Sequence, residues 1–294
     1  PFFKKAGCGF VEVGSVSAKK CKGNPRPRAF RLPDDQALIN RMGLNNAGAK
    51  AIRPRLEKAA GQIAFPVAVN LAKTHDPKIE GKAAIEDFCE SFRILAPWAD
   101  YVALNISCPN TAEGKTFEDP NSLDELLSAI MTLRKELALE VPVVVKFSPP
   151  LAESFILDSL FDELILVCLG HGIHGFIATN TASDRNGLVT SKERISKIGN
   201  GGLSGQPIRA RANGLVKYLF RKTSGKLPII GVGGIANAAQ AYERIKSGAS
   251  LIQLYTGLVY QGPGVIRDIK KGLVRLMEEE GHSSITHIVG IEAK

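Results

Sequence analysis

Short apolar runs alternate with longer amphipathic segments along the chain, and this alternation restricts the folds open to it. The runs are rich in β-branched residues and end in Gly, Ser, Asn or Thr. They occupy residues 9–15, 63–71, 100–107, 141–148, 174–181, 227–234 and 250–257. Segments with helical periodicity occupy residues 85–99, 123–138, 155–170, 208–223 and 236–249. Nearly continuous apolar strands alternating with amphipathic helices predict a parallel sheet covered by helices on its faces.

Two glycine-containing strand ends favour a closed barrel over an open sheet. "GVGG" ends the sixth run, and "LYTG" ends the seventh one βα repeat later. In a (β/α)8 barrel the loops after strands seven and eight commonly form a phosphate site, where glycine lets the backbone approach the anion. If these are strands seven and eight, strand one lies upstream of Pro1. We therefore expect an α/β fold, a (β/α)8 TIM barrel without its first strand, as a single N-terminally incomplete domain over residues 1–294.

Composition and charge exclude several classes of protein. Hydrophobic residues make up 44% of the chain and charged residues 23%, which is ordinary for a soluble globular protein, and no apolar run is long enough to span a membrane. The five cysteines are scattered without a C-x-x-C pair, and the five histidines form no ligand pattern, so we expect no disulfide framework and no metal. The net charge of +9 suits nucleic acid, an anionic membrane surface or anionic small ligands.

In a barrel, functional residues stand at the C-terminal ends of the strands. The predicted ends carry Ser15, Asn70, Asn105, Cys108, Asn110, Lys146, Thr179, Asn180, Thr181, Gly233, Gly234, Tyr255 and Thr256. The set contains amides, a lysine and a thiol but no carboxylate, which disfavours a glycosidase. Asn both donates and accepts hydrogen bonds, so these residues suit a planar heterocycle such as a pyrimidine or a flavin. Lys146 is suited to stabilise an anion formed on such a ring.

The stretch "NISCPNT", residues 105–111, leaves two interpretations of Cys108 open. A thiol with a reference pKa near ~8.5 needs only modest tuning to act as a base near neutrality. A single cysteine is also commonly a small buried apolar residue. Spacing alone does not choose between catalysis and packing.

Eight motifs, in order along the chain, resemble those of the dihydroorotate dehydrogenase family, the FMN enzymes of pyrimidine biosynthesis. They are "VEVGSVS" (11–17), "INRMGLNNAG" (39–48), "NISCPNT" (105–111), "VVVKFSP" (143–149), "IATNT" (177–181), "GGLSGQPI" (201–208), "LPIIGVGGI" (227–235) and "GASLIQLYTGL" (248–258). The forms "NRMGLNN", "GGLSGQP" and "QLYTG" resemble class 2, the quinone-reducing branch. The resemblance implies an FMN-binding barrel that oxidises dihydroorotate to orotate.

The resemblance also implies roles for individual residues. The positions that match FMN-binding residues are Ser15, Asn70, Asn105, Lys146, Thr179, Gly205, Gly233, Gly234, Tyr255 and Thr256. The positions that match substrate-binding residues are Asn40, Arg41, Met42, Gly43, Leu44, Asn105, Asn110, Asn180 and Thr181. Cys108 takes the position of the base that removes the C5 proton of dihydroorotate while hydride passes from C6 to FMN. Lys146 would neutralise charge on the reduced flavin.

Three departures from the class 2 pattern stand out. Class 2 members usually carry serine at the position of Cys108, and cysteine is the class 1 choice. The residues after "NT" read "AEGKTFED" instead of the class 2 form "PGLR". The family's first strand and a flavin-contacting lysine would lie upstream of Pro1. The electron acceptor implied by the whole pattern is a quinone, with fumarate or NAD as the class 1 alternatives.

The class 2 resemblance also implies peripheral membrane association through a segment upstream of Pro1, with a cytoplasmic location as the alternative, and the family commonly forms homodimers. Two other functions stay open. A tRNA dihydrouridine synthase is also an FMN barrel and would suit the positive charge. The clustered asparagines fit a free pyrimidine better, so we expect no nucleic-acid partner. A non-catalytic phosphate-binding barrel is the third interpretation.

Overall fold

The computed structural model describes residues 2–107, 117–151 and 159–293. The chain divides into two compact units. The described part of unit 1 comprises residues 2–28, 42–107, 117–146 and 159–174. The described part of unit 2 comprises residues 29–41, 147–151 and 175–293.

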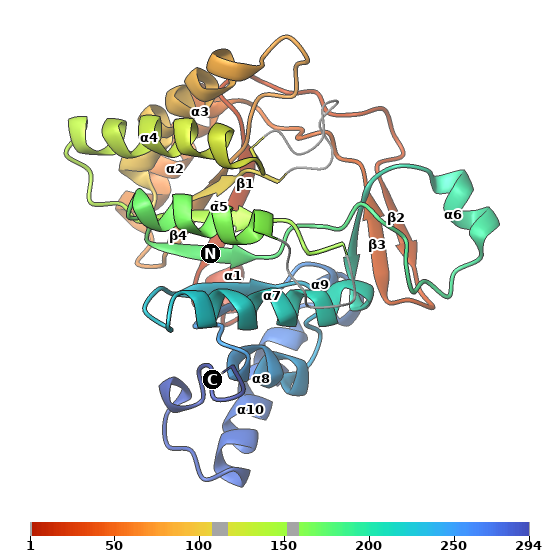
Figure 1. Cartoon of the computed structure of the whole chain (residues 1–294). Helices are drawn as coiled ribbons and strands as arrows, with labels where there is room; N and C mark the ends of the chain where they lie inside the picture. Colours follow the sequence, from red (N-terminus) through yellow and green to blue (C-terminus); the bar gives the residue numbers. More distant parts are fainter. Residues whose placement is uncertain (1, 108–116, 152–158, 294) are drawn as a thin grey trace. The chain divides into compact units, whose positions relative to one another are not determined.

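Unit 1 is built on parallel strands in the order β1–β4–β5–β6. Its strands are β1 (Val11–Val16), β4 (Val67–Leu71), β5 (Val102–Asn105) and β6 (Val143–Phe147). Its helices are α1 (Phe2–Lys5), α2 (Ala49–Gln62), α3 (Gly81–Leu95), η1 (Ala96–Trp98), α4 (Pro120–Glu136) and α5 (Ser159–Gly170). Helices α2 to α5 pack successively against one another (Figure 1). The register places Asn105 beside Lys146 at the ends of neighbouring strands.

Local sequence explains where the elements of unit 1 begin. Helix α4 starts at Pro120, whose fixed φ suits the first turn, and the Asp119 side chain accepts a hydrogen bond from the Asn121 N–H at 3.3 Å. Strand β5 is buried along its whole length, as expected for a strand covered on both faces. Phe88 and Phe92 of α3 are fully buried. This packing fixes the strand ends on which the polar residues stand.

Unit 2 contains three parallel strands and a small antiparallel sheet. The parallel strands are β7 (Gly175–Ala178), β9 (Ile229–Val232) and β10 (Leu251–Gln253). The antiparallel strands are β2 (Ala29–Leu32), β3 (Ala37–Asn40) and β8 (Gly202–Gly205). The helices are α6 (Lys192–Ile198), η2 (Gln206–Ile208), α7 (Arg209–Lys222), α8 (Ala238–Lys246), α9 (Thr256–Gln261), α10 (Gly264–Glu279) and η3 (Ile285–His287).

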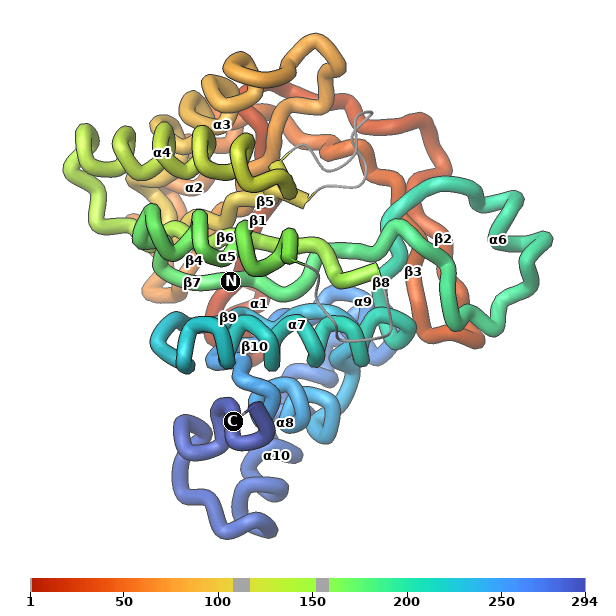
Figure 2. The backbone as a smooth tube through the Cα atoms, in the orientation of Figure 1, coloured from red at the N-terminus to blue at the C-terminus, as the bar shows by residue number. Residues whose placement is uncertain are grey.

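The antiparallel sheet joins segments that are far apart in the sequence. Strand β3 pairs with β8, so that Ala37 lies opposite Gly205 and Asn40 opposite Gly202 (Figure 2). An apolar cluster of Leu32, Ile39, Leu203 and Ile208, with further side chains around it, packs on these strands. Each strand has only four residues, so periodicity in the sequence did not predict this sheet.

All seven predicted parallel strands are confirmed, as β1, β4, β5, β6, β7, β9 and β10. The five predicted helical segments contain α3, α4, α5, α7 and α8, with end points that shift by a few residues. Strands and helices therefore alternate as a (β/α)8 fold requires. None of the helices in the described ranges is both long and apolar enough to cross a membrane.

Candidate functional site

Four predicted cofactor-binding residues of unit 1 come from its four neighbouring strands, and three of them form a hydrogen-bonded cluster. Ser15 Oγ donates to Asn70 Oδ1 at 2.6 Å and accepts a hydrogen bond from Asn105 Nδ2 at 3.1 Å. Both amides are buried. The fourth residue, Lys146, lies beside Asn105 in the parallel pairing of β5 with β6. The sequence prediction that these side chains gather at strand ends therefore describes the geometry of unit 1.

The same cluster contains a carboxylate that the strand-end analysis missed. Glu12 Oε1 accepts a hydrogen bond from Asn70 Nδ2 at 3.0 Å and lies 3.6 Å from Lys146 Nζ. Glu12 Oε2 accepts a hydrogen bond from the Tyr101 hydroxyl at 2.9 Å. The side chains of Lys146 and Glu12 are only 16% and 11% exposed. We call Glu12, Ser15, Asn70, Asn105 and Lys146, with Tyr101, the polar cluster.

Glu12 was missed because it lies within β1, before the strand end at which Ser15 stands. A signal was available in the sequence: a glutamate interrupts an otherwise apolar strand, where an unpaired charge would be costly. Such a residue calls for a buried partner, and Lys146 supplies a positive one.

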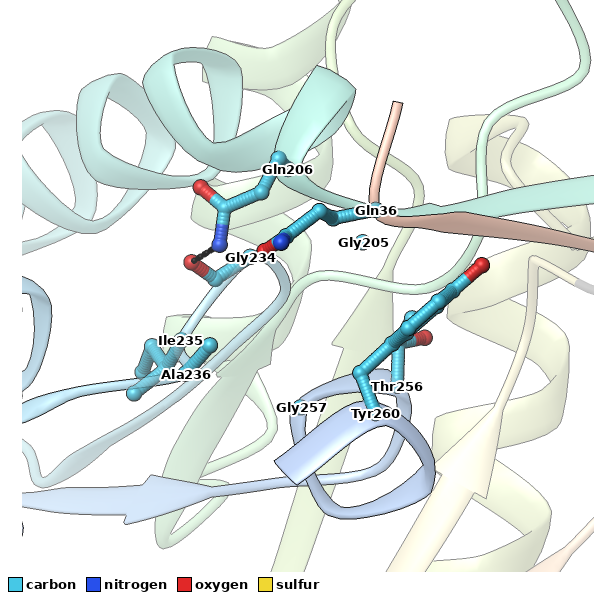
Figure 3. Close-up of a pocket in the computed structure, with 9 residues that line it drawn as sticks. All are labelled: Gln36, Gly205, Gln206, Gly234, Ile235, Ala236, Thr256, Gly257 and Tyr260. Atoms are coloured by element: carbon cyan, nitrogen blue, oxygen red, sulfur yellow. Dashed lines mark hydrogen bonds between the residues drawn. The ribbon is translucent and has the colours of Figure 1, made fainter. Parts of the chain in front are cut away.

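Unit 2 contains a pocket lined by glycine backbone together with both small and large side chains (Figure 3). Its lining residues are Gln36, Gly205, Gln206, Gly234, Ile235, Ala236, Thr256, Gly257 and Tyr260. Three of the predicted FMN-binding residues, Gly205, Gly234 and Thr256, are thus brought together, and we call this space the glycine pocket.

The glycines of this pocket are required by both conformation and space. Gly205 has φ of +105°, and a Cβ there would collide with the Gln36 carbonyl oxygen. Gly234 has φ of +71°, and a Cβ there would lie 2.5 Å from Arg209 Cβ. Residues other than glycine rarely adopt these φ values. Glycine at both positions therefore leaves backbone without a side chain at the wall of the pocket.

Hydrogen bonds hold the rim of the glycine pocket. Gln206 Nε2 donates to the Gly234 carbonyl oxygen at 3.2 Å (Figure 3), and the hydroxyls of Ser204 and Thr256 lie 2.8 Å apart. Thr179 follows β7, and its N–H donates to the Val232 carbonyl oxygen at 2.9 Å, next to Gly233. The Tyr255 side chain is 69% exposed and does not line the pocket, although Tyr255 immediately precedes α9.

Two of the predicted substrate residues of unit 2 meet at Gly202. Asn40 Nδ2 donates to the Gly202 carbonyl oxygen at 3.4 Å, and a Cβ on Gly202 would collide with the Thr181 side chain. Asn180 stands between Thr179 and Thr181, and its Oδ1 accepts a hydrogen bond from the Thr181 N–H at 2.8 Å. The ends of β3, β7 and β8 therefore bring these groups together.

The remaining predicted substrate residues have mainly backbone or packing contacts. Arg41 donates to the Ile198 carbonyl oxygen and stacks 4.7 Å from the centre of the Phe30 ring. Each carbonyl oxygen of the 42–44 loop has a polar neighbour. The Asn24 N–H donates to the Met42 carbonyl oxygen at 3.2 Å, and Asn46 Nδ2 donates to that of Leu44 at 2.7 Å. His75 Nδ1 lies 3.1 Å from the Gly43 carbonyl oxygen. Cys108 and Asn110 lie outside the described residues.

Comparison with known proteins places this geometry in a family. A sequence profile described as dihydroorotate dehydrogenase matches residues 2–277 of the chain. The chain belongs to the dihydroorotate dehydrogenase family. It is 42% identical, over 98% of its length and 75% of the relative's, to the dihydroorotate dehydrogenase (quinone) of Roseiflexus castenholzii. The enzyme of the same name from Nostoc punctiforme is 40% identical over 98% of this chain and 76% of the relative.

Solved dihydroorotate dehydrogenases share the fold. Two crystal structures of the Eimeria tenella enzyme, one in complex with ferulenol and one ligand-free, each match with a TM-score of 0.90. Their sequences are 31% and 32% identical to this chain. Each match covers 99% of this chain, and it covers 81% of the first crystal chain and 84% of the second. The predicted barrel fold class and the resemblance to quinone-type dihydroorotate dehydrogenases are thereby confirmed, and the chain is an oxidoreductase.

Proposed function

We propose that the chain oxidises dihydroorotate to orotate with FMN as its cofactor and a quinone as its electron acceptor. The observation that carries the proposal is the glycine pocket. The family resemblance implies FMN-binding roles for Gly205, Gly234 and Thr256, and all three line one pocket in unit 2. Glycine backbone at a pocket wall is suited to a phosphate group, which backbone N–H groups can approach closely.

Taken separately, each cluster has the chemistry that the family positions of its residues assign to one part of FMN. In the glycine pocket, bare backbone and the Thr256 hydroxyl would hold the phosphate. In the polar cluster, the buried amides of Asn70 and Asn105 offer donors and acceptors to a heterocycle. FMN supplies the hydride acceptor when it is bound.

Lys146 would stabilise negative charge that develops on the heterocycle, because a preorganised cation at a partly buried site acts strongly on such charge. The ammonium is held in place through its ion pair with Glu12 at 3.6 Å. Glu12 is fixed in turn by Asn70 and by the Tyr101 hydroxyl. The pair thus keeps Lys146 oriented while limiting the net positive charge of the cluster.

In the same proposal Cys108 is the base that takes the C5 proton of dihydroorotate. Asn105 in unit 1, and Asn180 and Thr181 in unit 2, each match a substrate-binding position of the family. These roles come from the family positions of the residues. The thiol at 108 is also the feature that favours the second candidate function, in which fumarate or NAD replaces the quinone.

A steady-state assay tests the function and the acceptor together. The purified, FMN-loaded protein is given dihydroorotate with a soluble quinone, fumarate or NAD in separate reactions, and orotate is quantified. We expect orotate formation to depend on the quinone. If orotate forms only with fumarate or NAD, the acceptor is not a quinone, but dihydroorotate is still the substrate. If no orotate forms with any acceptor, the proposed function is wrong.

A further inference from the structure

Arg244 of helix α8 lies directly behind the backbone of the glycine pocket. Its side chain is fully buried, and its Nη2 donates to the Gly233 carbonyl oxygen at 2.8 Å. The guanidinium is held by Asn213, whose Oδ1 accepts from Nε, and by the Arg209 carbonyl oxygen, which accepts from Nη2 at 3.4 Å. Gly231 leaves the room for it, because a Cβ there would lie 2.6 Å from Arg244 Cγ.

The hydrogen bond to Gly233 orients a donor. The carbonyl of Gly233 and the N–H of Gly234 belong to one planar trans peptide, so they point in opposite directions. Because the carbonyl faces Arg244, the Gly234 N–H faces away from it, on the side where Gly234 lines the pocket. Within the described parts of the chain this N–H has no hydrogen-bond acceptor. A cation on the carbonyl also polarises the peptide and strengthens its N–H as a donor.

The charge of Arg244 also lacks a direct counter-ion. No carboxylate of the described residues forms a salt bridge with it, and its Nη1 has no hydrogen-bond partner there. Burial lowers the pKa of Arg244 to about 10, so the side chain is still protonated at neutral pH. The hydrogen bonds that Arg244 donates within the described residues go to neutral groups, and a buried cation that forms no ion pair is destabilising. A dianionic group bound in the neighbouring pocket would offset that cost.

We propose that Arg244 is a positioning residue that makes this site select phosphorylated flavin over flavin without a phosphate. It acts through the Gly233–Gly234 peptide and through its charge, without touching the ligand. The inference rests on the proposed FMN function and extends it by naming what sets the preference for the phosphate.

The test compares the dissociation constants of FMN and riboflavin for the flavin-free full chain, measured by quenching of flavin fluorescence. The wild type, Arg244→Met and Arg244→Lys are compared. Arg134→Met is the matched control, because Arg134 of unit 1 has a side chain that is only 15% exposed and also donates to a backbone carbonyl oxygen, that of Val141, at 2.8 Å.

We expect the riboflavin-to-FMN ratio of dissociation constants to fall about ten-fold in Arg244→Met, because the phosphate would lose a nearby buried positive charge and a polarised N–H donor. The riboflavin constant itself should change little. Arg244→Lys should lie between this variant and the wild type, and Arg134→Met should keep the wild-type ratio.

An unchanged ratio in Arg244→Met, or an equal fall in Arg134→Met, would overturn the inference. If Arg244→Met does not fold, Arg244→Lys decides in the same way: a reduced ratio supports the role, and a wild-type ratio overturns it. A wild type that binds neither flavin would instead overturn the proposed function, so the two failures are distinguishable.

Discussion

Glu12 Oε1 lies 3.6 Å from Lys146 Nζ within a cluster that buries most of both side chains. The other members of the cluster carry amides and hydroxyls, so within the cluster Glu12 is the counter-ion of Lys146. Removing one member leaves the other charge partly buried without its counter-ion, which is the costly case for an ion pair.

We expect Glu12→Gln to lower the free energy of unfolding by about 1–3 kcal/mol, because the glutamine keeps only one of the two accepting oxygens and no longer balances the charge of Lys146. The control is Glu57→Gln, since Glu57 also lies 3.6 Å from its partner, Arg53, but on the surface, with side chains 44% and 52% exposed. That change should cost less than about 0.5 kcal/mol. Urea denaturation of both variants gives the comparison, and equal losses would show that the Glu12–Lys146 pair is no more than a surface interaction.

We expect the hydrogen bonds that Asp35 accepts within unit 2 to be sensitive to acid. Burial alone would raise its pKa, but hydrogen bonds from the Thr190 hydroxyl and from the N–H groups of Val189 and Thr190 outweigh burial and lower the pKa below its ordinary value. The folded state therefore favours the ionised form. The stabilisation is complete above the unfolded-state pKa of Asp35 and is lost as the pH falls through the lowered folded-state pKa.

We accordingly expect Asp35→Asn to reduce the melting temperature at neutral pH and to narrow the difference between variant and wild type in acid. Thermal unfolding followed by circular dichroism over a pH series measures both effects. The relevant range extends from neutrality to below the ordinary carboxyl pKa. A gap between the two proteins that stays constant over this range would show that ionised Asp35 does not stabilise the fold.

Gly205→Ala should damage the glycine pocket. The added Cβ would meet the Gln36 carbonyl oxygen and lie 2.8 Å from Ala37 Cα, and φ is +105°. We expect a loss of more than about 1 kcal/mol of stability together with a reduced FMN content after purification. The matched control is Gly61→Ala in α2, where a Cβ meets nothing within 4 Å.

That control should be neutral or stabilising by up to about 1 kcal/mol, because alanine is the better helix residue. FMN is quantified by absorbance after the protein is denatured. Full FMN content in Gly205→Ala would remove Gly205 from the proposed cofactor site.

Cys108 is tested by kinetics. A general base typically contributes about 10²–10⁴-fold, so Cys108→Ala should slow flavin reduction by about 100-fold or more while FMN stays bound. Cys108→Ser should keep some activity, with its pH dependence shifted upward because a hydroxyl is a weaker acid than a thiol. Stopped-flow absorbance across a pH series measures both variants. Near-normal reduction in Cys108→Ala would refute the base assignment.

Much of the fold could be predicted because the strands of an α/β protein are apolar along their whole length. The pattern in "VPVVVKFS" or "LPIIGVGG" reports burial on both faces, and each such run became a parallel strand. The antiparallel sheet of β2, β3 and β8 could not be predicted, since its strands have only four residues each and β3 pairs with β8, which is far away in the sequence. Helix α2 was also missed, and it contains Pro54, a residue that normally argues against a helix interior.

The candidate site was predicted in part for a similar reason. Strand ends locate Ser15, Asn70, Asn105 and Lys146, and the structure joins the first three by hydrogen bonds. Glu12 and Arg244 were not predicted, because each lies inside an element and not at a strand end, and the partner of Glu12, Lys146, is distant in the sequence. Tyr255 shows the opposite limit: its position matches a cofactor residue, yet its side chain is exposed.

A single anaerobic turnover tests most directly whether this chain oxidises dihydroorotate with FMN. The FMN-loaded protein is mixed with dihydroorotate in the absence of any acceptor, and the flavin absorbance is followed while orotate is quantified. We expect the yellow flavin to bleach and orotate to appear in an amount equal to the flavin reduced. A flavin that stays oxidised in the presence of saturating dihydroorotate would contradict this expectation.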